Sequence, residues 1–122
     1  MKQYYTNKEQ SRELVELGLK SETADMFYFD DNGGDPSFKV RNGIEYYYES
    51  EDCLPCWSLG ALLEVLAKKA LEFDDDGSAV LSSYMGTWSV NMFDCPIECS
   101  ENYDNPIDAV YEMVIKVLKY GR

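Results

Sequence analysis

A segment near the middle of the chain, residues 55–66, constrains the fold more than any other. It opens with Pro55, which ends the element before it, and continues with Trp57 and Ser58, an aromatic anchor and an N-cap. Four leucines then recur at the i, i+3, i+4 and i+7 spacing of one helix face: Leu59, Leu62, Leu63 and Leu66. We therefore predict a central helix over residues 57–72 whose apolar side packs on a sheet.

Two further helices are predicted, one toward each end of the chain. Thr6 and Glu9 stand at the spacing of a capping box, which predicts a helix over residues 7–18. An Asn-Pro pair followed by an apolar set at helical spacing predicts a last helix over residues 106–120. Helices therefore lie at both ends and in the middle of the sequence.

Runs of β-prone residues fill the intervals between the helices. An Asn-Gly pair at 42–43 and a Met-Gly-Thr turn at 85–87 each separate two such runs, which predicts two hairpins. Because strands and helices do not alternate singly, we expect one α+β domain over residues 1–122: an antiparallel sheet of about four to five strands with three helices packed on it. The β-prone runs are 26–29, 38–40, 44–49, 79–84 and 88–93. The expected core includes Leu14, Trp57, Leu62, Leu63, Leu66, Trp88, Val110 and Val114.

The charge balance limits the kinds of partner. Eleven basic residues against 23 acidic ones give a net charge of −12, which disfavours direct binding to nucleic acid and to anionic membranes. The sequence has no apolar run long enough to span a membrane and no hydrophobic signal core near Met1. We therefore expect a cytoplasmic protein whose partner is another protein.

The sequence contains no histidine. This excludes Ser-His and Cys-His nucleophile pairs and every metal site that needs an imidazole ligand. A phosphate-binding glycine loop is also missing, and the acidic loops do not have the spacing of a calcium-binding loop. These absences favour a protein that is not an enzyme and that has no cofactor.

The four cysteines permit an alternative of a different class, a dithiol enzyme or a zinc protein. Cys53 and Cys56 form a C-x-x-C pair just before the predicted central helix, where the positive end of the helix dipole would lower a thiol pKa. Together with Cys95 and Cys99 they could also supply four thiolates to zinc. A chain with enough apolar residues for its own core does not need such a site, so we expect no metal and four reduced thiols.

Three segments carry a resemblance to other proteins: residues 4–26, the segment Pro-Cys-Trp-Ser-Leu-Gly-Ala-Leu-Leu at 55–63, and residues 107–121. Together they resemble a group of short uncharacterised proteins of gut anaerobic bacteria and their phages or prophages. The P-x-W-S-L-G-A-L-L segment is the most specific part of this similarity. Members of the group do not depend on four cysteines, and they end in a longer tail with a tryptophan that residues 117–122 lack. The resemblance implies a context in a mobile element but no activity.

These observations together predict a non-enzymatic interaction protein. Tyrosine provides contact area at low entropic cost, and an acidic rim suits a basic partner, so the expected binding surface lies in the tyrosine-rich acidic stretch. An alternative of the same non-catalytic kind is a DNA mimic, in which carboxylates in rows occupy the DNA channel of a nucleic-acid-binding protein. The residues of the expected surface are Tyr46, Tyr48, Glu49, Glu51 and Asp52.

Overall fold

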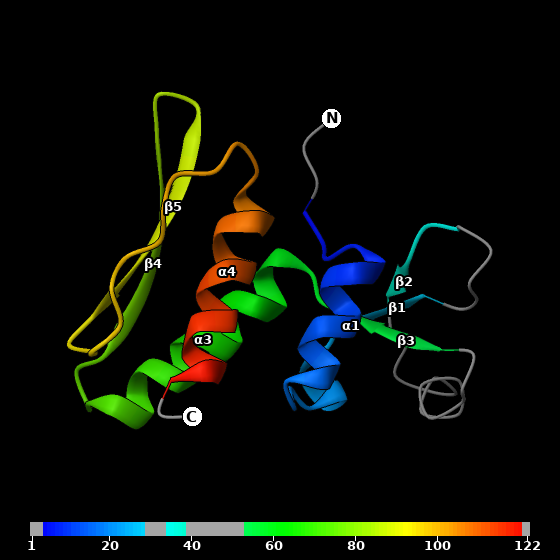
Figure 1. Ribbon diagram of the computed structural model, residues 1–122, viewed down its shortest axis with the longest axis horizontal. Coiled ribbons are helices and arrows are strands. Elements are labelled where there is room, and N and C mark those ends of the chain that lie inside the picture. Colours follow the sequence, from blue (N-terminus) through cyan, green and yellow to red (C-terminus); the bar gives the residue numbers. More distant parts are fainter. Residues whose placement is uncertain (1–3, 29–33, 39–52, 121–122) are drawn as a thin grey trace.

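The computed structural model describes residues 4–28, 34–38 and 53–120. These ranges contain both helices and antiparallel strands, which confirms the α+β class (Figure 1). The predicted hairpin around Asn42-Gly43 and residue 29 of the first predicted strand lie outside the described residues. In chain order the elements are α1 (Lys8–Glu16), the 3-10 helix η1 (Ser21–Thr23), β1 (Met26–Tyr28), β2 (Ser37–Phe38), β3 (Leu54–Cys56), α3 (Leu59–Phe73), β4 (Ser78–Tyr84), β5 (Thr87–Phe93) and α4 (Pro106–Lys119).

Within the described ranges the strands form two sheets, whereas the sequence predicts a single one. The first sheet has the order β2-β1-β3, and β1 pairs antiparallel with both neighbours: Met26 lies opposite Phe38 on one side and opposite Cys56 on the other. The second sheet is the two-stranded hairpin β4-β5. Helices α3 and α4 lie between the two sheets (Figure 1).

Strand β3 was not predicted from the sequence. Pro55 was expected only to end the preceding element, but it lies within β3 opposite Phe27. Within the described part of the chain β3 is an edge strand of its sheet, and edges are where strand prolines occur because the missing N–H can face away from the ladder. Pro55 therefore marks a short edge strand that leads directly into the N-cap of α3.

The start of α1 is shifted by one residue from the predicted capping box. Asn7, and not Thr6, is the N-cap: its side chain accepts a hydrogen bond from the Gln10 amide at 2.8 Å, and the Gln10 side chain accepts one from the Asn7 amide at 3.0 Å. The helix ends at Glu16 because Gly18 adopts a positive φ of 90°. The box predicted between Thr6 and Glu9 is therefore wrong, although the helix that it signals is present.

Thr6 is instead a buried junction between the N-terminal segment and the central segment. Its hydroxyl accepts a hydrogen bond from the Trp57 amide at 3.1 Å and shares another with the Ser11 hydroxyl at 2.8 Å. Its backbone amide donates to the Trp57 carbonyl at 2.9 Å, so residues 4–6 run antiparallel to residues 57–59. A threonine fits here because the buried polar groups around it all need a partner.

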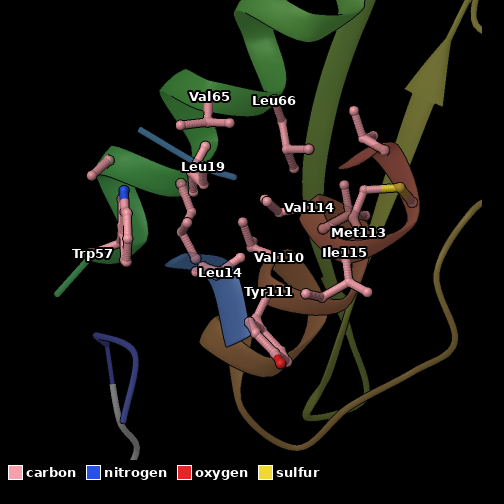
Figure 2. Close-up of a cluster of buried hydrophobic side chains, with 14 of the residues drawn as sticks. Leu14, Leu19, Trp57, Val65, Leu66, Val110, Tyr111, Met113, Val114 and Ile115 are labelled. Atoms are coloured by element: carbon pink, nitrogen blue, oxygen red, sulfur yellow. The ribbon is translucent and has the colours of Figure 1, made fainter. Parts of the chain in front are cut away.

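The core lies where α3 and α4 pack against each other and against α1 and the hairpin (Figure 2). Ser58 is the N-cap of α3 as predicted, since its hydroxyl accepts from the Ala61 amide at 3.2 Å. Both carboxylate oxygens of Asp25 in turn accept hydrogen bonds from Ser58, from its amide and from its hydroxyl. Six of the predicted core residues are fully buried: Leu14, Trp57, Leu62, Leu66, Val110 and Val114.

Leu63 and Trp88 were predicted to be in the core but are only partly buried against it. The buried face of α3 is centred on Leu62, Val65 and Leu66, which turns Leu63 toward the edge of the helix contact. Trp88 lies at the end of β5 next to the hairpin turn, and the fully buried residues of this strand begin only at Val90. The leucine spacing therefore predicts that this helix is buried. It does not predict which of its residues face the core.

The hairpin β4-β5 lies at one end of the molecule, against α3 and α4, and its tip extends past the start of α4 (Figure 1). A tight turn at Asp74–Gly77 connects it to α3, with the Gly77 amide donating to the Asp74 carbonyl at 2.9 Å. A Cβ atom on Gly77 would lie 2.1 Å from the Ala70 carbonyl oxygen, so only glycine fits. This close approach holds the base of the hairpin on the last turn of α3.

Candidate interaction surface

The residues that the sequence indicates for partner binding, Tyr46, Tyr48, Glu49, Glu51 and Asp52, lie outside the described residues. The structure therefore does not test whether these five residues form one surface. It does describe a second region with the properties of a binding surface, the hairpin β4-β5.

The second cysteine of the C-x-x-C pair, Cys56, has a buried thiol. Cys56 lies at the end of β3, three positions before α3 begins at Leu59, and is fully buried. Its thiol lies 3.4 Å from the Thr6 carbonyl oxygen, to which it donates. Burial raises the pKa of the Cys56 thiol from 9.0 to about 11, although its hydrogen bonds with Thr6 and Tyr28 act in the opposite direction. The net shift of this pKa is upward, opposite in direction to the lowering expected for a thiol just before a helix.

The other cysteine pair lies at the opposite end of α3. The Cys95 thiol is 3.9 Å from the carbonyl oxygen of Ala70, in the last turn of that helix, and Cys99 is exposed. Since Cys56 precedes the first turn of α3, the two pairs are separated by roughly the length of a 15-residue helix, about 20 Å. In the residues that the structure describes, which include all four cysteines, no group of three His, Cys, Asp or Glu side chains could hold a metal ion.

The hairpin turn combines backbone strain with exposure. Tyr84 pairs with Thr87, which leaves Met85 and Gly86 as a two-residue loop with φ values of 52° and 83°. Two positive φ values define a type I′ turn, whose first position suits asparagine, aspartate or glycine. A methionine there is strained, and this one is 85% exposed, next to a Tyr84 that is 77% exposed.

The strand register gives the hairpin an inner and an outer face. Ala79 and Leu81 of β4 and Val90 and Met92 of β5 alternate onto the inner face and pack on the core. Ser83 and Trp88, which pair with each other near the turn, continue this inner face, and the residues that alternate with it point to the opposite side. We define the hairpin face as the exposed apolar side chains on this outer side and at the tip: Val80, Tyr84, Met85 and Phe93.

The hairpin is also free of charge in a strongly acidic chain. Residues 77–93 contain no Asp, Glu, Lys or Arg, although 28% of the whole sequence is charged. Acidic residues flank this stretch on both sides, Asp74, Asp75 and Asp76 before it and Asp94 after it. An uncharged apolar patch with a charged rim has the anatomy of a protein–protein interface. The hairpin itself is predicted from the sequence, and this gap in the charge pattern is the signal that could have indicated it as a candidate binding surface.

The two long edges of the hairpin differ. The outer edge of β5 is covered by the connection to α4: Trp88 and Tyr103 exchange backbone hydrogen bonds of 2.7 and 2.8 Å, and the Ser100 amide donates to the Val90 carbonyl at 2.9 Å. Strand β4 pairs with β5 only, within the described part of the chain. The hairpin therefore presents one closed edge and one open edge.

A groove of about 550 Å³ lies on the other side of the molecule, between η1 and α3. Its lining includes three lysines, Lys20, Lys68 and Lys69, and three glutamates, Glu22, Glu64 and Glu72. Two of the lysines form ion pairs along α3, Lys68 with Glu64 at 3.4 Å and Lys69 with Glu72 at 3.3 Å. The groove wall is therefore of mixed charge and does not select an anion.

None of the helices in the described ranges is long and apolar enough to cross a membrane. No protein-family model matches the chain, and comparisons with curated proteins and with solved structures find no match.

Proposed function

We propose that this protein is a non-enzymatic binding protein that docks on a protein partner through the hairpin face. The observation that carries the proposal is the tip of the hairpin, where Tyr84 and Met85 are 77% and 85% exposed and Met85 adopts the left-handed conformation. Exposed apolar side chains and backbone strain both lower the stability of a free protein. Their coincidence at one turn is explained by a role in binding.

The residue types support this role. Tyrosine is enriched at the energetic centres of interfaces, and methionine adapts its unbranched side chain to the shape of a partner. Asparagine would remove the strain at position 85 but would not supply apolar contact area. The strain and exposure at Met85 are consistent with a methionine that is present because it contacts a partner, and not because it favours the turn.

The charges around the hairpin indicate the chemistry of the partner. Asp74, Asp75, Asp76 and Asp94 are all exposed and lie at the base of the uncharged hairpin. A complementary surface would have an apolar centre with lysine or arginine at its rim. The acidic rim would then raise the association rate more than the affinity.

The alternative of DNA mimicry receives less support from the described residues. Mimicry needs carboxylates in uninterrupted rows, and Glu9, Glu13 and Glu16 of α1 come nearest to such a row. Arg12 and Lys119 line the same surface groove as these three glutamates. These cations weaken the negative electrostatic potential that a DNA-binding channel would recognise, so we favour an apolar interface.

The same proposal includes the absence of catalysis and an origin in a mobile element. Cys56, the buried member of the C-x-x-C pair, is poorly placed as a nucleophile because burial disfavours its thiolate. The mobile-element context comes from the resemblance of residues 4–26, 55–63 and 107–121 to short proteins of gut anaerobic bacteria and their phages or prophages. A small binding protein that acts on a host protein is consistent with that context.

The proposal is tested by affinity capture from a lysate of a gut anaerobic bacterium. The bait is the wild-type protein at low and at high salt, with Tyr84→Ser as the test variant and Leu71→Ser as the control. Leu71 is a matched control because it is apolar and 55% exposed but lies on α3. We expect one host protein that is retained at high salt by wild type and Leu71→Ser and lost with Tyr84→Ser.

Two other results would contradict the proposal. Capture of a DNA-binding protein that is released at high salt and is insensitive to Tyr84→Ser would support mimicry instead. A set of captured proteins that is the same for all three baits would show that the hairpin face is not the binding surface.

A further inference from the structure

The open edge of β4 has backbone groups that point away from the hairpin. In a two-residue hairpin loop the residues that flank the loop, here Tyr84 and Thr87, form a hydrogen-bonded pair. Because hydrogen-bonded and non-bonded pairs alternate along an antiparallel ladder, Ala79, Leu81 and Ser83 direct their N–H and C=O groups outward. The outer edge of β5 shows the same alternation of inward and outward backbone groups. Trp88, which pairs with Ser83, forms its backbone hydrogen bonds outward, to Tyr103.

Among the residues that the structure describes, this edge also lacks the features that normally prevent strand pairing. Natural edge strands carry a lysine, a proline or a bulge, or lie under a loop or helix. Strand β4, Ser-Ala-Val-Leu-Ser-Ser-Tyr, has no charge and no proline, and its register with β5 is continuous from Ser78 opposite Phe93 to Tyr84 opposite Thr87. In the described ranges the amides of Ala79, Leu81 and Ser83 have no backbone partner. The edge is therefore available for a further strand.

We propose that the occupant of this edge is β4 of a second copy of the chain, paired antiparallel about Leu81. In this register Leu81 lies opposite Leu81 of the second copy and Ala79 lies opposite Ser83, so the outward-pointing groups of both strands meet in hydrogen-bonded pairs. Each such pair exchanges two backbone hydrogen bonds. The product is a four-stranded antiparallel sheet of the order β5-β4-β4-β5.

The charge distribution selects a second copy over a basic peptide. Two copies of a chain with net charge −12 repel each other except where their surfaces are uncharged, and residues 77–93 are uncharged. Antiparallel pairing also places the acidic run Asp74–Asp76 of one copy beyond Tyr84 of the other, so the two acidic runs lie at opposite ends. A basic strand would find no carboxylate among the side chains of β4.

This inference goes beyond the proposed function because it concerns the strand edge and not the hairpin face. Pairing at the edge leaves the outer sides of both hairpins on one continuous face. Two strands bury less area than a stable dimer interface requires, so we expect a dissociation constant in the micromolar range or weaker. Such a dimer would present two copies of the hairpin face to a partner.

The test compares Ser83→Pro with the matched control Ser83→Ala. Proline removes the outward amide donor without affecting the ladder to β5, whereas alanine retains it, and Ser83 is exposed in the monomer. The oligomeric state is measured by sedimentation at concentrations up to about 1 mM. We expect wild type and Ser83→Ala to dimerise alike and Ser83→Pro to dimerise at least about tenfold more weakly. Thermal unfolding of each variant monitors folding.

A second readout locates the interface. Amide exchange at Ala79, Leu81 and Ser83 should slow as the wild-type concentration rises, and Met85→Asn should leave this change intact. A monomer throughout this range would overturn the inference, and so would a dimer in which these amides remain unprotected. Protection that appears only when another protein is added would show that the edge serves a different partner. Loss of partner capture with Tyr84→Ser while dimerisation persists separates this inference from the proposed function.

Discussion

The backbone amide of Trp57 donates a hydrogen bond of 3.1 Å to the hydroxyl of Thr6, a residue 51 positions earlier in the chain. The same hydroxyl contacts Ser11 at 2.8 Å, and the Thr6 carbonyl accepts from the Tyr28 hydroxyl at 2.6 Å. One fully buried threonine therefore connects the N-terminal segment, α1, β1 and the start of the central segment.

Thr6→Val should lower the free energy of unfolding by about 1–3 kcal/mol, because the Trp57 amide and the Ser11 hydroxyl lose a buried partner. Valine keeps the shape of threonine, so the loss reports on the hydrogen bonds. Denaturant unfolding measures the change. Thr6→Ser retains the hydroxyl and serves as the control, and an equal loss in both variants would assign the effect to packing.

Leu62→Ala should lower the free energy of unfolding by about 2–5 kcal/mol, since Leu62 is fully buried on the face of α3 that packs on the core. Leu63→Ala should cost less because Leu63 is only partly buried. Leu71→Ala, at an exposed position of the same helix, should change stability by less than about 0.5 kcal/mol. Equal effects at Leu62 and Leu63 would contradict the observed rotation of α3.

The buried Cys56 thiol should make stability fall at alkaline pH. Its pKa is about 11 in the folded protein, above its ordinary value of 9.0, so the unfolded chain releases this proton first. The contribution is fully present below pH 9 and is lost as the pH rises through 11. Unfolding measured from pH 7 to 11 should show a smaller decline in Cys56→Ala than in wild type, each relative to its own value at pH 7. Identical declines would exclude the assignment.

Met85→Asn should raise the free energy of unfolding by about 1 kcal/mol, because asparagine tolerates the left-handed conformation that Met85 adopts. Gly86→Ala should have the opposite effect at the neighbouring position, where φ is 83°. Thermal unfolding of both variants measures whether each change raises or lowers the free energy of unfolding. A destabilised Met85→Asn would mean that the methionine side chain stabilises the free protein.

Local sequence patterns predicted the elements that depend on local interactions. The leucine spacing and Ser58 predicted α3, the Asn-Pro start predicted α4, and the strands around Met85-Gly86 predicted the hairpin. Each of these signals comes from neighbours along the chain, and each element is present in the structure.

The features that sequence did not predict depend on contacts between distant segments. Thr6 matches a capping box, but its burial against Trp57 leaves the cap to Asn7. Strand β3 forms because β1 provides a partner, although Pro55 argues against a strand. The hairpin face could not be recognised from propensity, since exposure of Tyr84 and Met85 follows only from the strand register and the packing of the inner side on the core.

The most direct test of the hairpin face is the affinity of the captured partner for Tyr84→Ser relative to wild type. Tyr84 is the largest side chain at the exposed tip, and loss of an aromatic residue at the centre of an interface typically costs about 2 kcal/mol or more, roughly a 30-fold loss of affinity. Calorimetric titration with the purified partner gives the two dissociation constants, with Leu71→Ser as the control. The account predicts a loss of about 30-fold for Tyr84→Ser and no change for Leu71→Ser. Equal affinities for wild type and Tyr84→Ser would contradict it.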